Sequence, residues 1–309
     1  MSKLPIVGAM LIAGCSAAAA ASPARGEQVI QVPGFADFLA VDGDSVWATN
    51  DARVERWSPK GRISSVPMSK PCGAMAIFEG SLWVADCKEL ALVRVDTANA
   101  QKAATIVTGI ANPKGELNVV AGDGSIWVAS DDKGAVSRID PQTNKVTATI
   151  AVSPGTHYLT FGFGALWAVS SEAATVQRID PASNMVVKTT KLGKSPAFLA
   201  AGEGAVWVQE QGDGTVARVD PVSAEVTGRV KVGDVLKYGD IDTGGGTVWL
   251  RTTEDQTFVA IDPVALTVKA RVGKAEGSGA LRYTEAGLWT SAHDVHTLTW
   301  WPDPKKLVE

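Results

Sequence analysis

The sequence has 309 residues, of which 45% are hydrophobic and 20% charged, and its formal net charge is −4. This composition is typical of a folded protein and argues against a long disordered segment. Lysine and arginine are scattered rather than clustered, so the positive surface that a nucleic-acid partner requires is not expected.

The first 27 residues differ from the rest and predict export. Lys3 precedes an apolar run from Leu4 to Gly14, and small residues follow from Ala17 to Ala21. A short positive region, a short apolar region and small residues at the exit are typical of a secretory signal peptide. The apolar run is too short to span a bilayer, and no later stretch reaches the length of a transmembrane helix. We therefore expect a periplasmic protein with no transmembrane segment in its mature chain.

Two routes of maturation stay open for this leader. The sequence ending at Cys15, Leu-Ile-Ala-Gly-Cys, resembles the bacterial lipobox, in which the cysteine is lipidated and anchors the mature protein to a membrane. The alternative is an ordinary signal peptide cleaved near Ala19–Ala21, which discards the cysteine. Under either route residues 16–27 form a leader or tether, and residues 28–309 are expected to form one domain.

From residue 36 onward the sequence repeats itself. Seven tryptophans recur 36 to 44 residues apart, most of them in the phrase Gly-x-Gly-x-x-Trp. They are Trp47, Trp83, Trp127, Trp167, Trp207, Trp249 and Trp289. A second phrase, Arg-Ile-Asp-Pro in its clearest copies, follows each about a dozen residues later. A period near 40 with short β-branched runs is the signature of propeller blades, so seven tryptophans predict seven blades.

Each repeat predicts four antiparallel strands. In the fifth repeat they are expected over residues 198–201, 205–209, 215–220 and 225–232. The glycines before each tryptophan predict a tight hairpin between the first two strands, and Asp-Pro predicts a type I turn after the third. The recurrent tryptophan is expected to pack between neighbouring blades, where it buries a large apolar surface.

The ends of the chain are expected to meet in the last blade. The seventh repeat supplies only three strands, over residues 280–283, 288–291 and 297–301. The fourth is available at the other end, where residues 28–33 have the pattern of an outer strand. The sequence therefore predicts an all-β, seven-bladed β-propeller of four-stranded antiparallel blades, closed by its N-terminal strand.

The repeat resembles two related groups of propellers. Residues 138–146, Arg-Ile-Asp-Pro-Gln-Thr-Asn-Lys-Val, together with the Trp-Val phrase before them, look like the exported YVTN-type propellers and the streptogramin (virginiamycin B) lyase group. Residues 47–50, Trp-Ala-Thr-Asn, are close to the tetrapeptide that names the first group, with tryptophan in place of tyrosine. The resemblance extends over residues 28–304 and implies the propeller fold, which lyases and binding proteins share.

Two cysteines remain beyond the leader. Cys72 precedes the first strand of the second repeat, and Cys87 follows its second strand. Both connections belong to one face of the ring, and paired cysteines in an oxidising compartment favour a disulfide over a metal site.

The loops on that same face surround the mouth of the central channel and supply the candidate site. His157 opens the first strand of the fourth repeat and is the candidate base, with a hydrogen-bonded rim histidine as the alternative interpretation. The candidate ligand-binding residues are Glu116, Glu172, Glu210, Lys237, Arg251 and His293. The loops also carry Asp37, Asp240 and Asp294, and any one of these charges is explained equally by a solvated loop.

Two functions are therefore predicted. The first is a non-catalytic binding propeller that holds a small molecule, a peptide or an envelope partner at the channel mouth. The second, implied by the resemblance, is a lyase that performs metal-assisted β-elimination with a histidine base and a divalent cation, Mg²⁺ or Ca²⁺, held by glutamates. If the protein is an enzyme, a lyase is favoured over a hydrolase. No metal ligands are assigned, and a monomer is expected.

Overall fold

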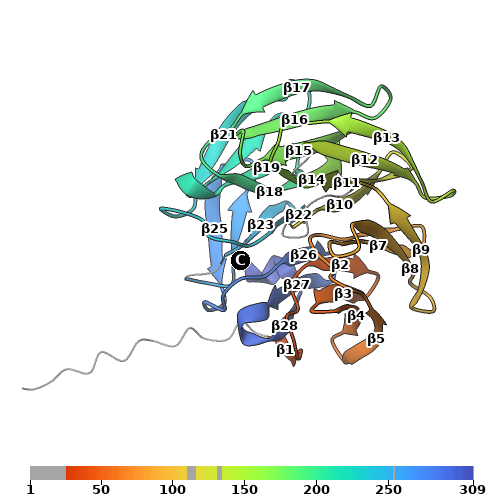
Figure 1. Cartoon of the computed structure of the whole chain (residues 1–309). Helices are drawn as coiled ribbons and strands as arrows, with labels where there is room; N and C mark the ends of the chain where they lie inside the picture. Colours follow the sequence, from red (N-terminus) through yellow and green to blue (C-terminus); the bar gives the residue numbers. More distant parts are fainter. Residues whose placement is uncertain (1–25, 110–115, 131–133, 253–254, 309) are drawn as a thin grey trace, which may run out of the picture.

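Seven four-stranded antiparallel sheets surround a central axis in the computed structural model (Figure 1). The structure describes residues 26–109, 116–130, 134–252 and 255–308. Among these residues no helix is long and apolar enough to cross a membrane. The expected signal peptide and Cys15 lie outside the described residues. The fold is therefore the predicted all-β, seven-bladed propeller.

The first four blades follow one another along the chain. Blade one comprises β2 (Leu39–Asp42), β3 (Ser45–Asn50), β4 (Arg53–Ser58) and β5 (Gly61–Pro67). Blade two comprises β6 (Ala76–Phe78), β7 (Ser81–Asp86), β8 (Ala91–Asp96) and β9 (Gln101–Val107). Blade three comprises β10 (Val119–Gly122), β11 (Ser125–Ser130), β12 (Ala135–Asp140) and β13 (Lys145–Ala151). Blade four comprises β14 (Thr156–Gly162), β15 (Ala165–Ser170), β16 (Thr175–Asp180) and β17 (Met185–Lys191).

Of the last three blades, blades five and seven include short 3-10 helices. Blade five comprises β18 (Pro196–Gly202), β19 (Ala205–Glu210), η1 (Gln211–Asp213), β20 (Thr215–Val219) and β21 (Val226–Lys231). Blade six comprises β22 (Ile241–Gly244), β23 (Thr247–Arg251), β24 (Phe258–Asp262) and β25 (Thr267–Val272). Blade seven comprises β26 (Leu281–Thr284), β27 (Gly287–Ala292), η2 (His293–Val295), β28 (Thr297–Pro302) and β1 (Gln28–Gln31), and η3 (Pro304–Leu307) follows β28. The first strand of each repeat lies nearest the axis (Figure 1).

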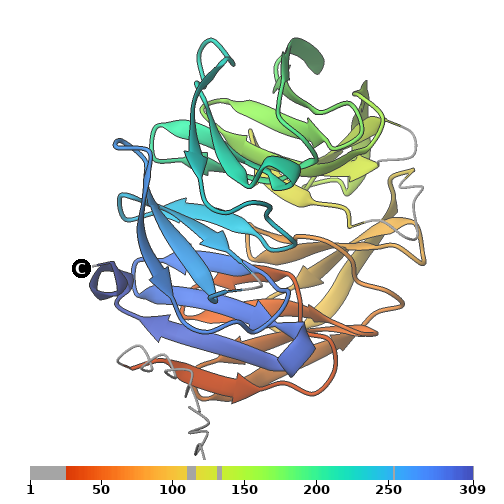
Figure 2. The ribbon, with the colours of Figure 1, turned by 90° about the vertical axis from the view of Figure 1, so that its left-hand side faces the viewer.

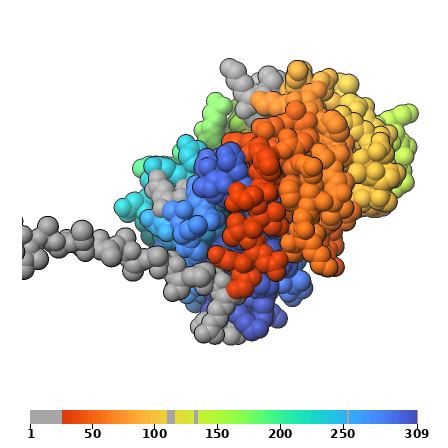
Figure 3. Space-filling view, turned by 90° about the horizontal axis from the view of Figure 1, so that it is seen from below, coloured from red at the N-terminus to blue at the C-terminus, as the bar shows by residue number. Residues whose placement is uncertain are grey.

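The N-terminal strand closes the ring, as predicted. β1 pairs with β28 in an antiparallel register that places Gln28 opposite Trp300 and Gln31 opposite Thr297. The red N-terminal residues and the blue C-terminal residues accordingly lie side by side in Figures 2 and 3. The strand ends at Gln31 rather than at residue 33, because Pro33 has no N–H to continue a ladder.

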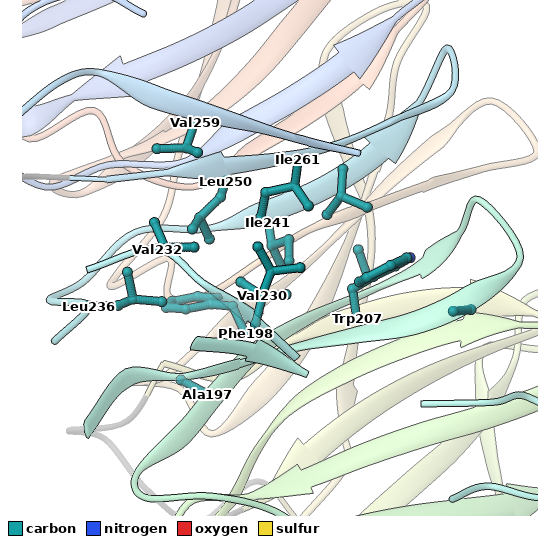
Figure 4. Close-up of a cluster of buried hydrophobic side chains, with 14 of the residues drawn as sticks. Ala197, Phe198, Trp207, Val230, Val232, Leu236, Ile241, Leu250, Val259 and Ile261 are labelled. Atoms are coloured by element: carbon teal, nitrogen blue, oxygen red, sulfur yellow. The ribbon is translucent and has the colours of Figure 1, made fainter. Parts of the chain in front are cut away.

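The seven blade tryptophans are buried between neighbouring blades. Each is at most 1% exposed. Trp207 of blade five, for example, packs with Val248 and Ile261 of blade six in one apolar cluster (Figure 4). Its indole N–H also donates to the carbonyl oxygen of Gly202, 3.1 Å away, which satisfies the buried polar atom. The predicted inter-blade role of the tryptophans is confirmed.

The two glycines before the tryptophan have different roles. In the turn after β10, Gly124 has φ +64° and Asp123 has φ 50°, as a tight hairpin of this hand requires. Gly122 has no positive φ, but a Cβ there would lie 2.1 Å from the ring of Phe161 in the next blade. The second glycine therefore serves the turn, as predicted, and the first allows two blades to approach closely.

The Arg-Ile-Asp-Pro phrase ties each of several blades to the next. The Asp140 carboxylate accepts the N–H of Gln142 at 2.8 Å, and this hydrogen bond lowers the pKa of Asp140. The guanidinium of Arg138 lies 4.6 Å from the ring centroid of Trp127 and donates to the carbonyl oxygen of Pro181 in blade four at 2.5 Å. The phrase thus makes both the predicted turn and a contact between blades.

The predicted disulfide is confirmed. Cys72 and Cys87 are bonded, with their Cα atoms 6.0 Å apart and a sequence separation of 15. The backbone also pairs here, since the Cys72 N–H donates to the Ala85 oxygen at 3.0 Å and the Cys87 N–H to the Lys70 oxygen at 2.9 Å. Two loops on the channel-mouth face of blade two are therefore held together covalently.

Candidate functional site

A cavity of about 490 Å³ opens at the mouth of the central channel. Its wall is built by the loops that precede the first strands and by the connections between the second and third strands of the blades. Four carboxyl groups from four different blades line it. They are Asp37 of blade one, Glu116 of blade three, Asp240 of blade six and Asp294 of blade seven.

Three aromatic rings form an apolar wall of the same cavity. Phe38, Tyr158 and Phe198 line it, and the ring centroids of Tyr158 and Phe198 are 4.4 Å apart. Phe38 and Phe198 are 6.3 Å apart and nearly buried, because both belong to the large apolar cluster of blades five and six. At the rim, Phe35 stacks on the imidazole of His293 with centroids 3.9 Å apart.

The repeat explains why these rings meet. Phe38, Tyr158 and Phe198 each stand nine positions before the tryptophan of their blade. This position directly precedes the strand nearest the axis or is its third residue, so equivalent residues of different blades face one central space. In blade six the same position holds Asp240. Aligning the repeats on their tryptophans would have revealed this ring of residues, which the sequence analysis missed.

Two of the four carboxylates have partners in blade seven. Asp240 is 4% exposed, forms an ion pair with Arg282 and accepts the N–H of Ile241 at 2.8 Å. Asp294 accepts the N–H of Ser278 at 2.7 Å.

Glu116 is paired with a cavity tyrosine. The hydroxyl of Tyr158 donates a hydrogen bond to the Glu116 carboxylate. Burial by the surrounding loops and the charge of Asp240 raise the pKa of Glu116, and the tyrosine hydrogen bond opposes that rise. Glu116 nevertheless keeps contact with solvent through the open mouth.

Asp37 differs from the other three. Among the residues that the structure describes, none donates a hydrogen bond to its carboxylate or forms an ion pair with it. Burial raises the pKa of Asp37 to about 8, and the charges of Glu116, Asp240 and Asp294 raise it further, against the opposing charge of Arg251. We therefore expect Asp37 to be mostly protonated below about pH 8.

His157, the candidate base, is not among the residues that line the cavity. The register of β14 against β15 shifts between Thr156 and Tyr158, which leaves His157 as the extra residue of a bulge. Successive strand residues point in opposite directions, and here Tyr158 is the one that reaches the cavity. The ring of His157 lies 5.8 Å from that of Tyr158.

Glu210 and Arg251 were expected at the solvent-facing rim, but both are buried. The Glu210 carboxylate is held by Arg229 at 2.8 Å and by the N–H of Gly193 at 2.7 Å. The Arg251 guanidinium donates to backbone carbonyl oxygens, including that of Ser291 at 3.1 Å. Their charged groups are committed to internal partners, so both residues stabilise the loops around the mouth.

The remaining candidates divide between the cavity and its surroundings. Glu116 and His293 line the cavity. Lys237 lies beside the mouth and lines a shallow pocket of about 40 Å³. Glu172 is exposed and packs over Gly155.

The described residues do not form the metal site that the resemblance implies. Within these residues, no group of three or more histidine, cysteine, aspartate or glutamate side chains is arranged to hold a metal ion. Glu210 is committed to Arg229 and His157 lies outside the cavity wall, so the predicted base and ligands do not converge. The residues present therefore do not fit a histidine base beside a glutamate-held cation.

The chain was compared with protein families, with curated proteins and with solved structures. A family model described as a repeat of unknown function (DUF6923) matches residues 88–216, and no curated protein matches the chain. The solved virginiamycin B lyase from Staphylococcus aureus is 15% identical, with a TM-score of 0.76, and the match covers 89% of this chain and 98% of that one. A solved streptogramin B lyase is 13% identical, with a TM-score of 0.75, over 89% of this chain and 95% of that one. At this identity the likeness is one of architecture, and the chain is a seven-bladed β-propeller with the fold of these two lyases.

Proposed function

We propose that this protein is a binding propeller whose channel-mouth cavity holds a small molecule. The supporting observation is one cavity of about 490 Å³ that combines three aromatic rings with a few carboxyl groups. Sites for small molecules are typically concave, several hundred cubic ångströms in volume and largely apolar, with a few polar groups that orient the ligand. A peptide side chain or the exposed group of an envelope protein are ligands of the same kind.

The scaffold suits such a role because it holds the loops in fixed positions. The ring is closed by β1 against β28, and the disulfide joins two loops on the channel-mouth face. Loops that a rigid framework positions are the usual carriers of binding residues. A preorganised cavity binds more tightly than one that must be ordered by its ligand.

A second candidate function is metal-assisted β-elimination. The shared fold with two lyases is its support, although the described residues do not themselves form the metal site that this reaction needs. His293 favours it as well, because burial lowers the pKa of this cavity imidazole and so keeps it neutral at neutral pH, as a base must be. Elemental analysis of the purified protein separates the two candidates. A stoichiometric divalent metal favours the lyase, and its absence favours binding alone.

Filling the cavity is expected to abolish binding without harming the fold. Gln211 lines the cavity from η1. Its backbone is held by hydrogen bonds with Ser195 and Leu236, and its side chain donates one long hydrogen bond, to Gln209 Oε1 at 3.3 Å. We expect Gln211→Trp to eliminate the saturation-transfer NMR signals of indole, quinoline and benzimidazole. Gln101→Trp, the same change at the exposed start of outer strand β9, should leave them intact. Equal signals from both variants would show that these probes bind elsewhere.

Export remains a proposal from the sequence. We expect the protein to fractionate with the cell envelope and, if Cys15 is lipidated, with a membrane. Cys15→Ser then blocks maturation, and Ser16→Ala, the neighbouring control, does not. A soluble mature form that begins after residue 19 would instead establish the ordinary signal peptide.

A further inference from the structure

We infer that the channel-mouth cavity selects a cationic ligand with an apolar body, an ammonium or guanidinium group attached to an aromatic or aliphatic moiety. This inference rests on the proposed binding function and names the ligand class of the same cavity. It follows from the charge of the wall, from one carboxylate that has no partner among the described residues, and from the aromatic rings beside it.

The charge of the wall is negative. It contains four carboxyl groups, and no lysine or arginine is among the described residues that line it. Arg251, whose charge acts on Asp37, donates to backbone carbonyls, and Arg282 pairs with Asp240, so both guanidinium groups are committed to the protein itself. Negative charges placed together in a concave site attract a cation and repel an anion.

Asp37 supplies a specific contact for a cation. Its carboxyl lies in the wall, and no described residue hydrogen-bonds to it, whereas Asp240, Asp294 and Glu116 each have a partner. Polar groups enclosed by protein are normally hydrogen-bonded, so an orphan that faces a cavity calls for an external donor. An N⁺–H group of a ligand would make a charge-assisted hydrogen bond there.

The aromatic rings supply the second half of the site. Phe38 is the next residue after Asp37. Its ring centroid lies 6.3 Å from that of Phe198, which in turn lies 4.4 Å from that of Tyr158. Ring faces attract cations and also cover an apolar body. The wall therefore joins an acidic contact to an aromatic surface within one ligand's reach.

Three indole derivatives with the same body and different charges test this selectivity. Tryptamine carries an ammonium group, tryptophol is neutral, and indole-3-propionate carries a carboxylate. Measured by isothermal titration calorimetry at pH 8.5, tryptamine is expected to bind at least about tenfold more tightly than tryptophol. A tenfold ratio of dissociation constants corresponds to about 1.4 kcal/mol of binding free energy. Indole-3-propionate is expected to bind more weakly than either.

Two matched variants test whether Asp37 is the residue that gives the preference for a cation. Asp37→Asn keeps the shape of the side chain and is expected to weaken tryptamine about tenfold while changing tryptophol less than about twofold. Asp44→Asn makes the same change at an exposed position in the β2–β3 turn of the same blade and is expected to change neither. Melting temperatures of both variants should be at least equal to that of the parent, which separates lost recognition from lost folding.

The pH dependence gives an independent readout. A cation prefers the ionised Asp37, so tryptamine affinity should rise between pH 7 and pH 9 in the parent protein and stay flat in Asp37→Asn. Over this range the amine itself remains mostly charged, because primary ammonium groups titrate near pH 10. The other titratable or charged groups that face Asp37 from the surrounding loops are Glu116, Tyr158, Tyr238, Asp240, Arg251, His293 and Asp294.

The outcomes separate this inference from the proposed function. Tryptophol or indole-3-propionate binding as tightly as tryptamine, with Gln211→Trp still blocking all three, would overturn the cation preference and leave the cavity as a binding site. Failure of all three probes to bind the parent protein would count against both. Tryptamine binding that Asp37→Asn does not weaken would overturn the role of Asp37.

Discussion

Deletion of residues 28–33 is expected to cost more stability than any single substitution in the protein. The deletion removes β1 and with it the backbone pairing to β28. It also removes Val32, which is fully buried and whose N–H donates to the His296 oxygen at 2.8 Å. The ring loses the contact that joins its two ends, and β28 becomes an exposed edge that favours aggregation. We expect the melting temperature to fall by at least about 10 °C, or folding to be lost.

The matched control is a deletion of equal length in the leader. Both deletions are made in a chain that starts at residue 16, and the control removes residues 18–23. We expect this control to melt with the parent chain in a thermal scan followed by circular dichroism. Similar melting temperatures for the two deletions would mean that the ring does not depend on its N-terminal strand.

Trp207→Ala is expected to destabilise the protein by about 3–5 kcal/mol. The side chain is fully buried between blades five and six, and it loses both its apolar contacts and the hydrogen bond to Gly202. The surrounding strands are held by their own ladders and cannot collapse into the space, so a cavity remains. Denaturant unfolding monitored by circular dichroism measures the change in the free energy of unfolding.

Val222→Ala is the control for that substitution. Val222 lies in the same blade but is 84% exposed, so we expect its loss to change the free energy of unfolding by less than about 0.5 kcal/mol. A cost below about 1 kcal/mol for Trp207→Ala would contradict the inter-blade role of the tryptophans.

The architecture was predictable because its determinants repeat. Seven tryptophans recur at a near-constant spacing, and most of them follow the same turn residues, so repeated copies of one weak pattern reinforce one another. The closing strand followed from counting, since blade seven supplies three strands of its own and residues 28–31 supply the fourth. The disulfide followed from the placement of Cys72 and Cys87 on one face.

The site was harder to predict because loop charges look alike in sequence. Glu210 and Glu116 were both expected in loops, yet Glu210 ends β19 and is held by Arg229, whereas Glu116 reaches the cavity. Arg251 was expected to be exposed, but the neighbouring blade supplies carbonyl oxygens that enclose its guanidinium group. Such partners come from residues far away in the chain, and a single sequence does not reveal them.

A β-bulge explains why the candidate base, His157, does not line the cavity. The bulge at His157 places Tyr158 rather than the histidine at the cavity, and bulges depend on pairing that the sequence does not specify. The aromatic wall, by contrast, was within reach of sequence analysis. It occupies one fixed position relative to the tryptophans, but its members differ in type from blade to blade.

The most direct test of the binding account is a crystal structure of the protein grown with tryptamine. We predict one indole ring against Phe38, Tyr158 and Phe198, with the ammonium nitrogen about 2.8 Å from an Asp37 carboxylate oxygen. A cavity that remains empty at saturating tryptamine, or an ammonium group directed away from Asp37, would contradict it.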